Sequence, residues 1–345
     1  MSLKYLPDTA LATISISKSV FTYAQGDNGG IVECQGQLDV PLETQDQDIY
    51  VFDQPSWVTA RYQNNLVRPN APKLFTPLAA STIASTKYVF YVDDTNTLRG
   101  LKSGPTWAQE ATLAALAVRV AHYSQLAAVN IAENNFEAIV LYFQSPKKDA
   151  GIEFVSLSSK NNQWVKDKPD MTPIPPPPPV PPPRVVDPPL YGTALTAVRT
   201  RPGIEVFASK MPVVYLQWDT LALAHSQESK VETFRTLDLK FAPHTSLAIV
   251  DDGTQLYCFY TSSHNNNIKM ITIKDYKASP PVIVGTPTPR STIAAVLPTK
   301  DRIVLFYQAL NFDLSTVELK GLTFVRNTTT NVFAPLPNTE PALLA

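Results

Sequence analysis

A short phrase repeats six times along this chain, and the repetition constrains the fold more than any other feature. The phrase reads Ser or Thr, any residue, Leu or Ile, then Ala or Thr; its copies start at Thr9, Thr76, Ser124, Thr193, Thr245 and Ser291. After a short polar break, an apolar and aromatic run follows each copy, such as residues 139–144. Such runs favour β-strands, and the Gly and Pro residues between them supply hairpin turns. Each copy therefore predicts a β-hairpin.

A third apolar run follows each hairpin, and a fourth is visible less regularly. The fourth runs lie around Trp57, Trp107, Trp164 and residues 233–239, 282–284 and 332–333. The copies start 46 to 69 residues apart, near the length of a four-stranded propeller blade apart from two insertions. The sequence therefore predicts an all-β fold, a six-bladed β-propeller of four-stranded blades that forms a single domain over residues 1–345.

Two features leave room for other structures. A pair of β-sandwich domains would also give many short strands, but it does not explain six similar hairpins. Residues 106–129 are rich in Ala, Leu and Gln and show a helical period. If helical, this stretch is a single helical insertion between blades, and its last residues still supply the strand that starts near Ser124.

A proline-rich segment lies between the third and fourth repeats, at residues 169–189, and holds 12 of the 31 prolines. Proline lacks a backbone N–H and has a fixed φ, so this inter-blade loop is expected to be extended polyproline II rather than part of a sheet. One interpretation is a docking site for a polyproline-binding protein through Pro175, Pro178, Pro181 and the flanking Arg184. The other, which composition alone favours, is a stiff spacer.

Composition narrows the classes of partner and compartment. Lys and Arg number 29 against 30 Asp and Glu, so no basic surplus exists to neutralise nucleic acid. The N-terminal residues lack the apolar core of a secretory signal, and no apolar stretch is long enough for a spanning helix. We therefore expect a cytoplasmic protein with neither a nucleic-acid nor a membrane partner. Cys34 and Cys258 are expected to be buried free thiols rather than a disulfide.

No motif for catalysis, cofactor binding or metal binding is visible. The four histidines and two cysteines show no spacing of metal ligands, and the chain has no Gly-rich phosphate loop and no nucleophile elbow. Asp93-Asp94 and Asp251-Asp252-Gly253 fit hairpin turns better than calcium loops. We expect no enzyme activity, no cofactor and no metal site.

The repeat resembles that of the fungal fucose-specific lectin family of six-bladed propellers. The clearest copies pair residues 124–129 with 139–144 and residues 291–296 with 303–308, and the resemblance covers nearly the whole chain. It implies sugar pockets between adjacent blades, each with an Arg on the second strand, a Glu on the third and an aromatic residue from a neighbouring strand. Arg and Glu would give charge-assisted hydrogen bonds to hydroxyls, and the aromatic ring would cover the apolar face of the sugar.

Carried over position by position, the resemblance gives depleted pockets. The arginine place is taken by Phe21, Val89, Val140, Glu205, Tyr257 and Val304. The glutamate place is taken by Glu33, Gly100, Phe154, Met270 and Leu319, and the fourth repeat does not align there. Only Glu33 keeps the family residue. The candidate ligand-binding residues are therefore Glu33, Trp57, Trp107 and Trp164, although aromatic packing between blades is the simpler role for the tryptophans.

The sequence thus predicts a lectin-like carbohydrate-binding protein without catalysis, with altered or reduced specificity relative to the fucose lectins. Its partner would be a glycan or a glycoprotein. The alternative is a protein-interaction scaffold that has lost sugar binding and recruits partners through the polyproline loop. Pairing of propellers into a homodimer stays open.

Overall fold

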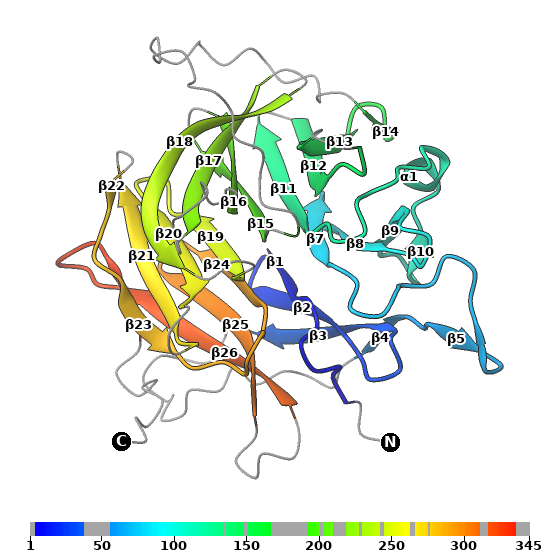
Figure 1. Ribbon diagram of the computed structural model, residues 1–345, viewed down its shortest axis with the longest axis horizontal. Coiled ribbons are helices and arrows are strands. Elements are labelled where there is room, and N and C mark those ends of the chain that lie inside the picture. Colours follow the sequence, from blue (N-terminus) through cyan, green and yellow to red (C-terminus); the bar gives the residue numbers. More distant parts are fainter. Residues whose placement is uncertain are drawn as a thin grey trace. The chain divides into compact units, whose positions relative to one another are not determined.

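The computed structural model describes residues 4–37, 56–133, 136–147, 151–166, 192, 194–200, 203–209, 219–227, 230–241, 245–262, 266–274, 277–310 and 317–335. They fall into two compact units, Met1–Thr76 with Ser246–Ala345 as the first and Pro77–Thr245 as the second. Figure 1 shows that both consist almost entirely of strands. The proline-rich segment 169–189, including Pro175, Pro178, Pro181 and Arg184, lies outside the described residues.

The first unit holds three antiparallel sheets in which strands adjacent in sequence pair with each other, except that β23 pairs with β21. Their strands are β1 (Ala12–Ile16), β2 (Ser19–Gln25), β3 (Ile31–Gln37) and β4 (Ser56–Thr59); β19 (Leu247–Asp251), β20 (Leu256–Thr261), β21 (Ile268–Lys274), β22 (Lys277–Ala278) and β23 (Val282–Gly285); and β24 (Ile293–Thr299), β25 (Arg302–Leu310), β26 (Val317–Arg326) and β27 (Phe333–Pro335). A two-stranded hairpin, β5 (Tyr62–Gln63) and β6 (Leu66–Val67), follows β4.

The second unit holds three four-stranded sheets, each with its strands paired in sequence order. Their strands are β7 (Ala79–Ile83), β8 (Thr86–Val92), β9 (Leu98–Lys102) and β10 (Ala108–Gln109); β11 (Leu126–Glu133), β12 (Phe136–Gln144), β13 (Ile152–Ser158) and β14 (Trp164–Val165); and β15 (Leu195–Thr200), β16 (Gly203–Ser209), β17 (Asp219–Gln227) and β18 (Lys230–Phe241). One short helix, α1 (Ala111–Ala115), separates the first two of these sheets along the chain.

The predicted hairpins are present in all six repeats, and five of the resulting sheets have the predicted four strands. The sheet of the fifth repeat differs, because both β22 and β23 pair with β21. In the fourth repeat the sequence has its third apolar run at residues 213–216, which lie outside the described residues, and the observed third strand is β17. The helical period in residues 106–129 corresponds only to the five residues of α1, after which β11 starts in the repeat phrase as expected.

The repeat phrase has a physical role that explains its first residue. In three repeats the Ser or Thr hydroxyl accepts a hydrogen bond from the backbone N–H of a Gln at or near the end of the second strand. The pairs are Thr9 with Gln25 at 2.9 Å, Ser124 with Gln144 at 2.8 Å and Ser291 with Gln308 at 2.8 Å. The hydroxyl thus satisfies a buried donor at a point where the hairpin ladder ends.

The side chains of the same glutamines reach the segment that leads into the next repeat. Gln25 Nε2 donates to the carbonyl of Lys73 at 2.9 Å, and Gln308 Nε2 donates to the carbonyl of Leu6 at 3.0 Å. Gln144 Oε1 accepts from the backbone N–H of Gly192 at 3.0 Å. We call each Ser/Thr–Gln pair with these bonds a latch, because it joins a hairpin to the chain that starts the following sheet.

Apolar side chains from facing sheets form the cores within each unit. One large cluster joins β7–β9 and α1 with β11–β14, and another joins β19–β23 with β24–β27. Smaller clusters join β11–β13 with β15, and β24–β26 with β1–β3. Cys34 and Cys258 are buried free thiols, as expected, and burial raises the pKa of Cys34 to about 11 and that of Cys258 to about 12.

The two aspartate motifs are hairpin turns, as predicted. Asp93 Oδ1 accepts hydrogen bonds from the Thr95 and Thr97 backbone N–H groups, and Asp93 Oδ2 accepts one from Arg99 Nε at 2.8 Å. Asp252 Oδ1 likewise accepts from Thr254 and Gln255. In the described part of the chain, no helix has the length and hydropathy needed to cross a membrane.

Candidate functional site

Strand register fixes which residues of the six repeats are equivalent at the arginine place. In the first sheet Phe21 of β2 pairs with Ile14 of β1, and the same pairing in the other sheets selects Val140, Glu205, Tyr257 and Val304, as expected. In the second sheet it selects Tyr88, which pairs with Ser81, so the expected Val89 is wrong by one residue. Val89 points to the opposite face of β8, because side chains alternate along a strand.

The glutamate place follows from the pairing of β2 with β3, where Glu33 lies opposite Tyr23. The equivalent positions are Gly100, Phe154, Leu223, Met270 and Gly321. The expectation of Leu319 in the sixth repeat is wrong, because Leu319 pairs with Gln308, two positions further along β25. Glu33 is the one carboxylate among these six positions.

Glu33 is held in place by a buried tyrosine on the same face of its sheet. Its side chain is 8% exposed, and Oε2 accepts a hydrogen bond of 2.7 Å from the Tyr23 hydroxyl. Burial, together with the charge and hydrogen bond of Glu33, raises the pKa of Tyr23 well above its usual value. Tyr23 therefore stays a neutral donor that fixes the orientation of the carboxylate.

Trp57 lies on the opposite face of this sheet from Glu33. Trp57 pairs with Val32, and Glu33 pairs with Ser56, so neighbouring residues of β3 direct the two side chains to different faces. The ring lies over Gly26 and Gly30, since a Cβ on either glycine would come within 2.9 Å of it, and it stays 43% exposed. The structure does not bring Glu33 and Trp57 together in one pocket.

Trp107 directly precedes the outer strand β10 and is partly exposed. Lys87 Nζ lies 5.5 Å from the centroid of its ring. A cation over the ring is a favourable contact in its own right, so one face of Trp107 is already engaged within the second unit.

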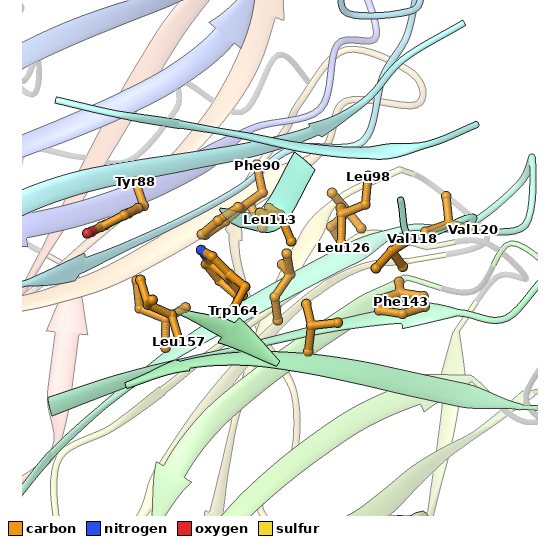
Figure 2. Close-up of a cluster of buried hydrophobic side chains, with 14 of the residues drawn as sticks. Tyr88, Phe90, Leu98, Leu113, Val118, Val120, Leu126, Phe143, Leu157 and Trp164 are labelled. Carbon is orange, nitrogen blue, oxygen red and sulfur yellow. The ribbon is translucent and has the colours of Figure 1, made fainter. Parts of the chain in front are cut away.

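Trp164 is a core residue, as Figure 2 shows. It is 3% exposed and meets the edge of Phe90 at 5.3 Å between ring centroids. Gly100, at the glutamate place of the facing sheet, lies beneath Leu113 of α1, and a Cβ there would be 2.9 Å from Leu113 Cδ2. The space that a family glutamate would need is therefore filled by a leucine.

The other interfaces within the two units are also apolar at these places. Val140 and Phe154 pack in the cluster with Leu195, and Phe154 lies 5.8 Å from Tyr142 between ring centroids. Tyr257 and Met270 pack in the cluster with Phe333, whose ring meets that of Tyr257 edge-on at 5.1 Å.

The interface between the sixth and first sheets follows the same pattern. Val304 of β25 is fully buried against β1–β3, and Gly321 is buried too. At the four interfaces inside the units, the arginine and glutamate places thus hold packing residues.

Comparison with known proteins finds similar folds but no similar sequence among protein-family models or curated proteins. The chain matches no protein-family model, and no curated protein matches it. Solved structures match over nearly its full length. The structure of the Aleuria aurantia lectin, described as a six-bladed beta-propeller with a novel fucose recognition mode, has 17% identity, covers 99% of both chains and gives a TM-score of 0.63.

Two other solved structures extend this result. AofleA from Arthrobotrys oligospora has 16% identity over 96% of this chain and 86% of its own, with a TM-score of 0.63. The BP39L lectin from Burkholderia pseudomallei has 12% identity over 95% of this chain and 99% of its own, with a TM-score of 0.56. The chain has the β-propeller fold described for the Aleuria aurantia lectin. The predicted all-β propeller and the resemblance to the fungal fucose-specific lectins are confirmed for the fold.

Sequence reasoning missed the residues that close the apolar interfaces. Leu113 and Phe333 fill or flank the places of sugar contacts, and Tyr23 orients Glu33. Tyr23 had a detectable signal, because it stands two residues before the Gln of its latch in the apolar and aromatic run of the first repeat. Leu113 had none, since nothing in the sequence links α1 to Gly100.

Proposed function

We propose that this protein is a lectin-like, non-catalytic carbohydrate-binding protein whose specificity is altered or reduced relative to the fucose-specific lectins. The observation that carries the proposal is Glu33, the one carboxylate among the six equivalent positions, held by Tyr23. The fold supports it by analogy, because its structural neighbours are lectins and one is described as recognising fucose.

The chemistry of the first repeat favours recognition of hydroxyl groups. A carboxylate accepts several hydrogen bonds at once, and hydrogen bonds to a charged acceptor are stronger than neutral ones. Because the Tyr23 hydroxyl already fixes one carboxylate oxygen of Glu33, ligand binding costs little further rotational entropy of this side chain. Glu33 is thus suited to a ligand that presents hydroxyl donors.

The arginine place explains why the specificity should differ. Phe21, which is 8% exposed, stands where the resemblance implies a guanidinium. Phenylalanine offers no donor to ring or hydroxyl oxygens, and loss of a charge-assisted hydrogen bond costs roughly 1.5–3 kcal/mol. Fucose is therefore expected to bind at least tenfold more weakly than in a pocket with the arginine, unless another ligand suits the apolar Phe21 better.

A glycan array that includes fucosides tests this proposal with three proteins. Wild type should bind at least one glycan, Glu33→Gln should lose that signal, and Glu318→Gln should retain it. Glu318 is a matched control, since it is an exposed glutamate on the third strand of another sheet of the same unit. Absence of any bound glycan for wild type, or equal binding by Glu33→Gln, would overturn the proposal. Trp57→Ala and Trp107→Ala test separately whether either ring contributes.

We also propose that the six sheets are the six blades of one propeller domain. Each sheet starts with the repeat phrase and has the same order of its first three strands, and the Aleuria aurantia lectin is described as six-bladed. The extra pairing of β23 would then be a local variation of the fifth blade. A crystal structure of the whole chain that shows another number of blades contradicts this count.

The alternative function, an interaction scaffold, is favoured by the apolar packing at the four interfaces inside the units. A scaffold needs the blades and not the sugar contacts. In this case partners would be recruited by the polyproline loop through Pro175, Pro178, Pro181 and Arg184. Binding to a panel of purified SH3 and WW domains tests the idea. Deletion of residues 172–186 should abolish any binding found, and an unchanged profile would exclude the loop as a docking site.

A further inference from the structure

Exposed apolar side chains are concentrated in one short stretch of the first unit. Nine large apolar residues are exposed among the described residues, and six of them lie between residues 57 and 75: Trp57, Tyr62, Leu66, Val67, Leu74 and Phe75. Single exposed apolar residues are normal, but such a concentration on a folded protein usually marks a binding surface.

The centre of this stretch is the hairpin β5–β6, which we call the finger and define as residues 61–70. Asn64 and Asn65 both have positive φ, 51° and 63°, as a two-residue type I′ turn requires. Tyr62 pairs with Val67 and Gln63 with Leu66, so Tyr62 and Val67 share one face and Leu66 lies on the other. Residues 62–70 are all exposed, and Figure 1 shows β5 running on beyond β4. Both faces of the finger are therefore open.

Buried contacts hold the base of the finger. Arg61 is 7% exposed, donates through Nη1 to the carbonyl of Pro72, and lies 5.7 Å from the Tyr62 ring centroid. Its Cδ packs against Gly29, where a Cβ would come within 2.6 Å. The Arg68 backbone N–H donates to the Arg61 carbonyl at 2.9 Å, which closes the hairpin at its base. A short hairpin is marginal alone, so this anchoring fixes its presentation.

The charge of the stretch indicates the sign of its partner. Residues 56–76 contain Arg61, Arg68 and Lys73 and no acidic residue. Arg68 is exposed, and its side chain makes no ion pair or hydrogen bond in the described part of the chain. A cation left in solvent beside exposed aromatic and aliphatic groups suits an anionic, partly apolar surface.

We propose that the finger attaches the protein to the surface of an anionic lipid membrane. A headgroup layer surrounds an inserted hairpin on all sides, and so covers Tyr62, Val67 and the opposite Leu66 together, whereas a flat protein partner covers one face. A symmetric contact with a second copy would bring two Arg68 side chains together. Asn64 and Asn65 at the tip keep hydrogen-bonding partners among headgroups, and Arg68 meets phosphate and carboxylate groups.

This proposal goes beyond carbohydrate binding and revises the expectation that no membrane partner exists. That expectation depended on the absence of a spanning segment, which surface attachment does not require. Attachment of this kind is reversible, because few apolar side chains enter the headgroup region. Glu33 is not part of the finger, so the two proposals fail independently.

Vesicle flotation of the full chain tests the finger. Vesicles of phosphatidylcholine with about 30% phosphatidylserine should bind the protein, and pure phosphatidylcholine should bind it several-fold more weakly. Leu66→Ser with Val67→Ser should weaken binding to the anionic vesicles about tenfold. Arg68→Gln should weaken it about fivefold and leave the weak binding to neutral vesicles unchanged. Val282→Ser with Ile283→Ser is the matched control, since these residues are 53% and 52% exposed on β23, and it should bind as wild type does.

Three outcomes would overturn the proposal. The first is no binding of wild type to anionic vesicles at low salt. The second is equal loss in the control pair, which would show a general effect of surface hydrophobicity. The third is binding that the double substitution Leu66→Ser with Val67→Ser does not weaken and that heparin inhibits to the same extent in wild type and in this variant. This outcome would indicate a polyanion partner instead. Circular dichroism of each variant confirms the fold, and all substituted side chains are exposed.

Discussion

Replacement of Trp164 tests whether this aromatic residue of an outer strand serves packing rather than ligand stacking. Trp164 is 3% exposed inside a cluster of sixteen buried residues, and its Nε1–H has no hydrogen-bond partner in the described structure. Its ring also meets Phe90 edge-on. Two substitutions, to Ala and to Phe, separate the contribution of volume from that of the indole N–H.

The two substitutions of Trp164 are expected to change the free energy of unfolding by clearly different amounts. Trp164→Ala removes a buried aromatic side chain and leaves a cavity, which costs roughly 3–5 kcal/mol in the free energy of unfolding. Trp164→Phe also loses apolar area, about 1 kcal/mol, but it removes a buried donor without a partner, whose burial costs about 1–3 kcal/mol. The second term equals or exceeds the first, so Trp164→Phe should leave stability unchanged or raise it by up to about 2 kcal/mol.

Urea unfolding followed by far-ultraviolet circular dichroism measures both values without depending on tryptophan fluorescence. Trp57→Ala is the control, because Trp57 is 43% exposed and its loss should cost clearly less than that of Trp164. A cost below about 1 kcal/mol for Trp164→Ala would refute the packing role. A cost for Trp164→Phe equal to that for Trp164→Ala would refute the assignment of an unpartnered N–H.

Three further predictions concern the latch, the aspartate turn and the thiols. Ser124→Ala leaves the buried backbone N–H of Gln144 without its acceptor and should destabilise the protein by about 1–3 kcal/mol in urea unfolding; a change below about 0.5 kcal/mol would contradict the latch. Burial alone would raise the pKa of Asp93, but hydrogen bonds from its turn outweigh burial and lower it, so its stabilising effect is present above about pH 4 and is lost as pH falls further. The stability difference between wild type and Asp93→Asn should therefore shrink on acidification from neutral pH, and a difference independent of pH would contradict this. Cys34 and Cys258 are buried and their pKa values are raised. Ellman's reagent near pH 8 should therefore label neither thiol in the native protein and both thiols in guanidinium. Fast labelling of the native protein would contradict this, because it would show that a thiol is accessible.

The sequence predicted the hairpins well because their signals are local. In three repeats a hydroxyl just before the first strand and a Gln at or near the end of the second define one unit, and the contact of Ser124 with Gln144 shows why both residue types recur. Turn residues such as Asp93 act within a few positions of the chain. Such signals need no knowledge of the partner sheet.

The side chains at the interfaces could not be predicted in the same way. Whether Trp57 shares a face with Glu33 depends on the register of β4 against β3, and the long connection between these strands leaves that register open in the sequence. The filling of the space beside Gly100 depends on Leu113 of a helix that the repeat does not contain. Both outcomes are decided by packing between elements.

The apolar residues at the arginine and glutamate places also change how much ligand binding can stabilise the fold. An interface that keeps an arginine and a glutamate holds polar groups that a ligand satisfies, so binding and stability are coupled there. Where Tyr88, Val140, Tyr257 or Val304 occupies the arginine place, the sheets already pack against each other without a ligand. A ligand could enter such an interface only by displacing buried side chains, at a cost comparable to a core mutation. If the proposed carbohydrate binding holds, ligand and stability are expected to be coupled at Glu33, which keeps its carboxylate and is 8% exposed against Tyr23.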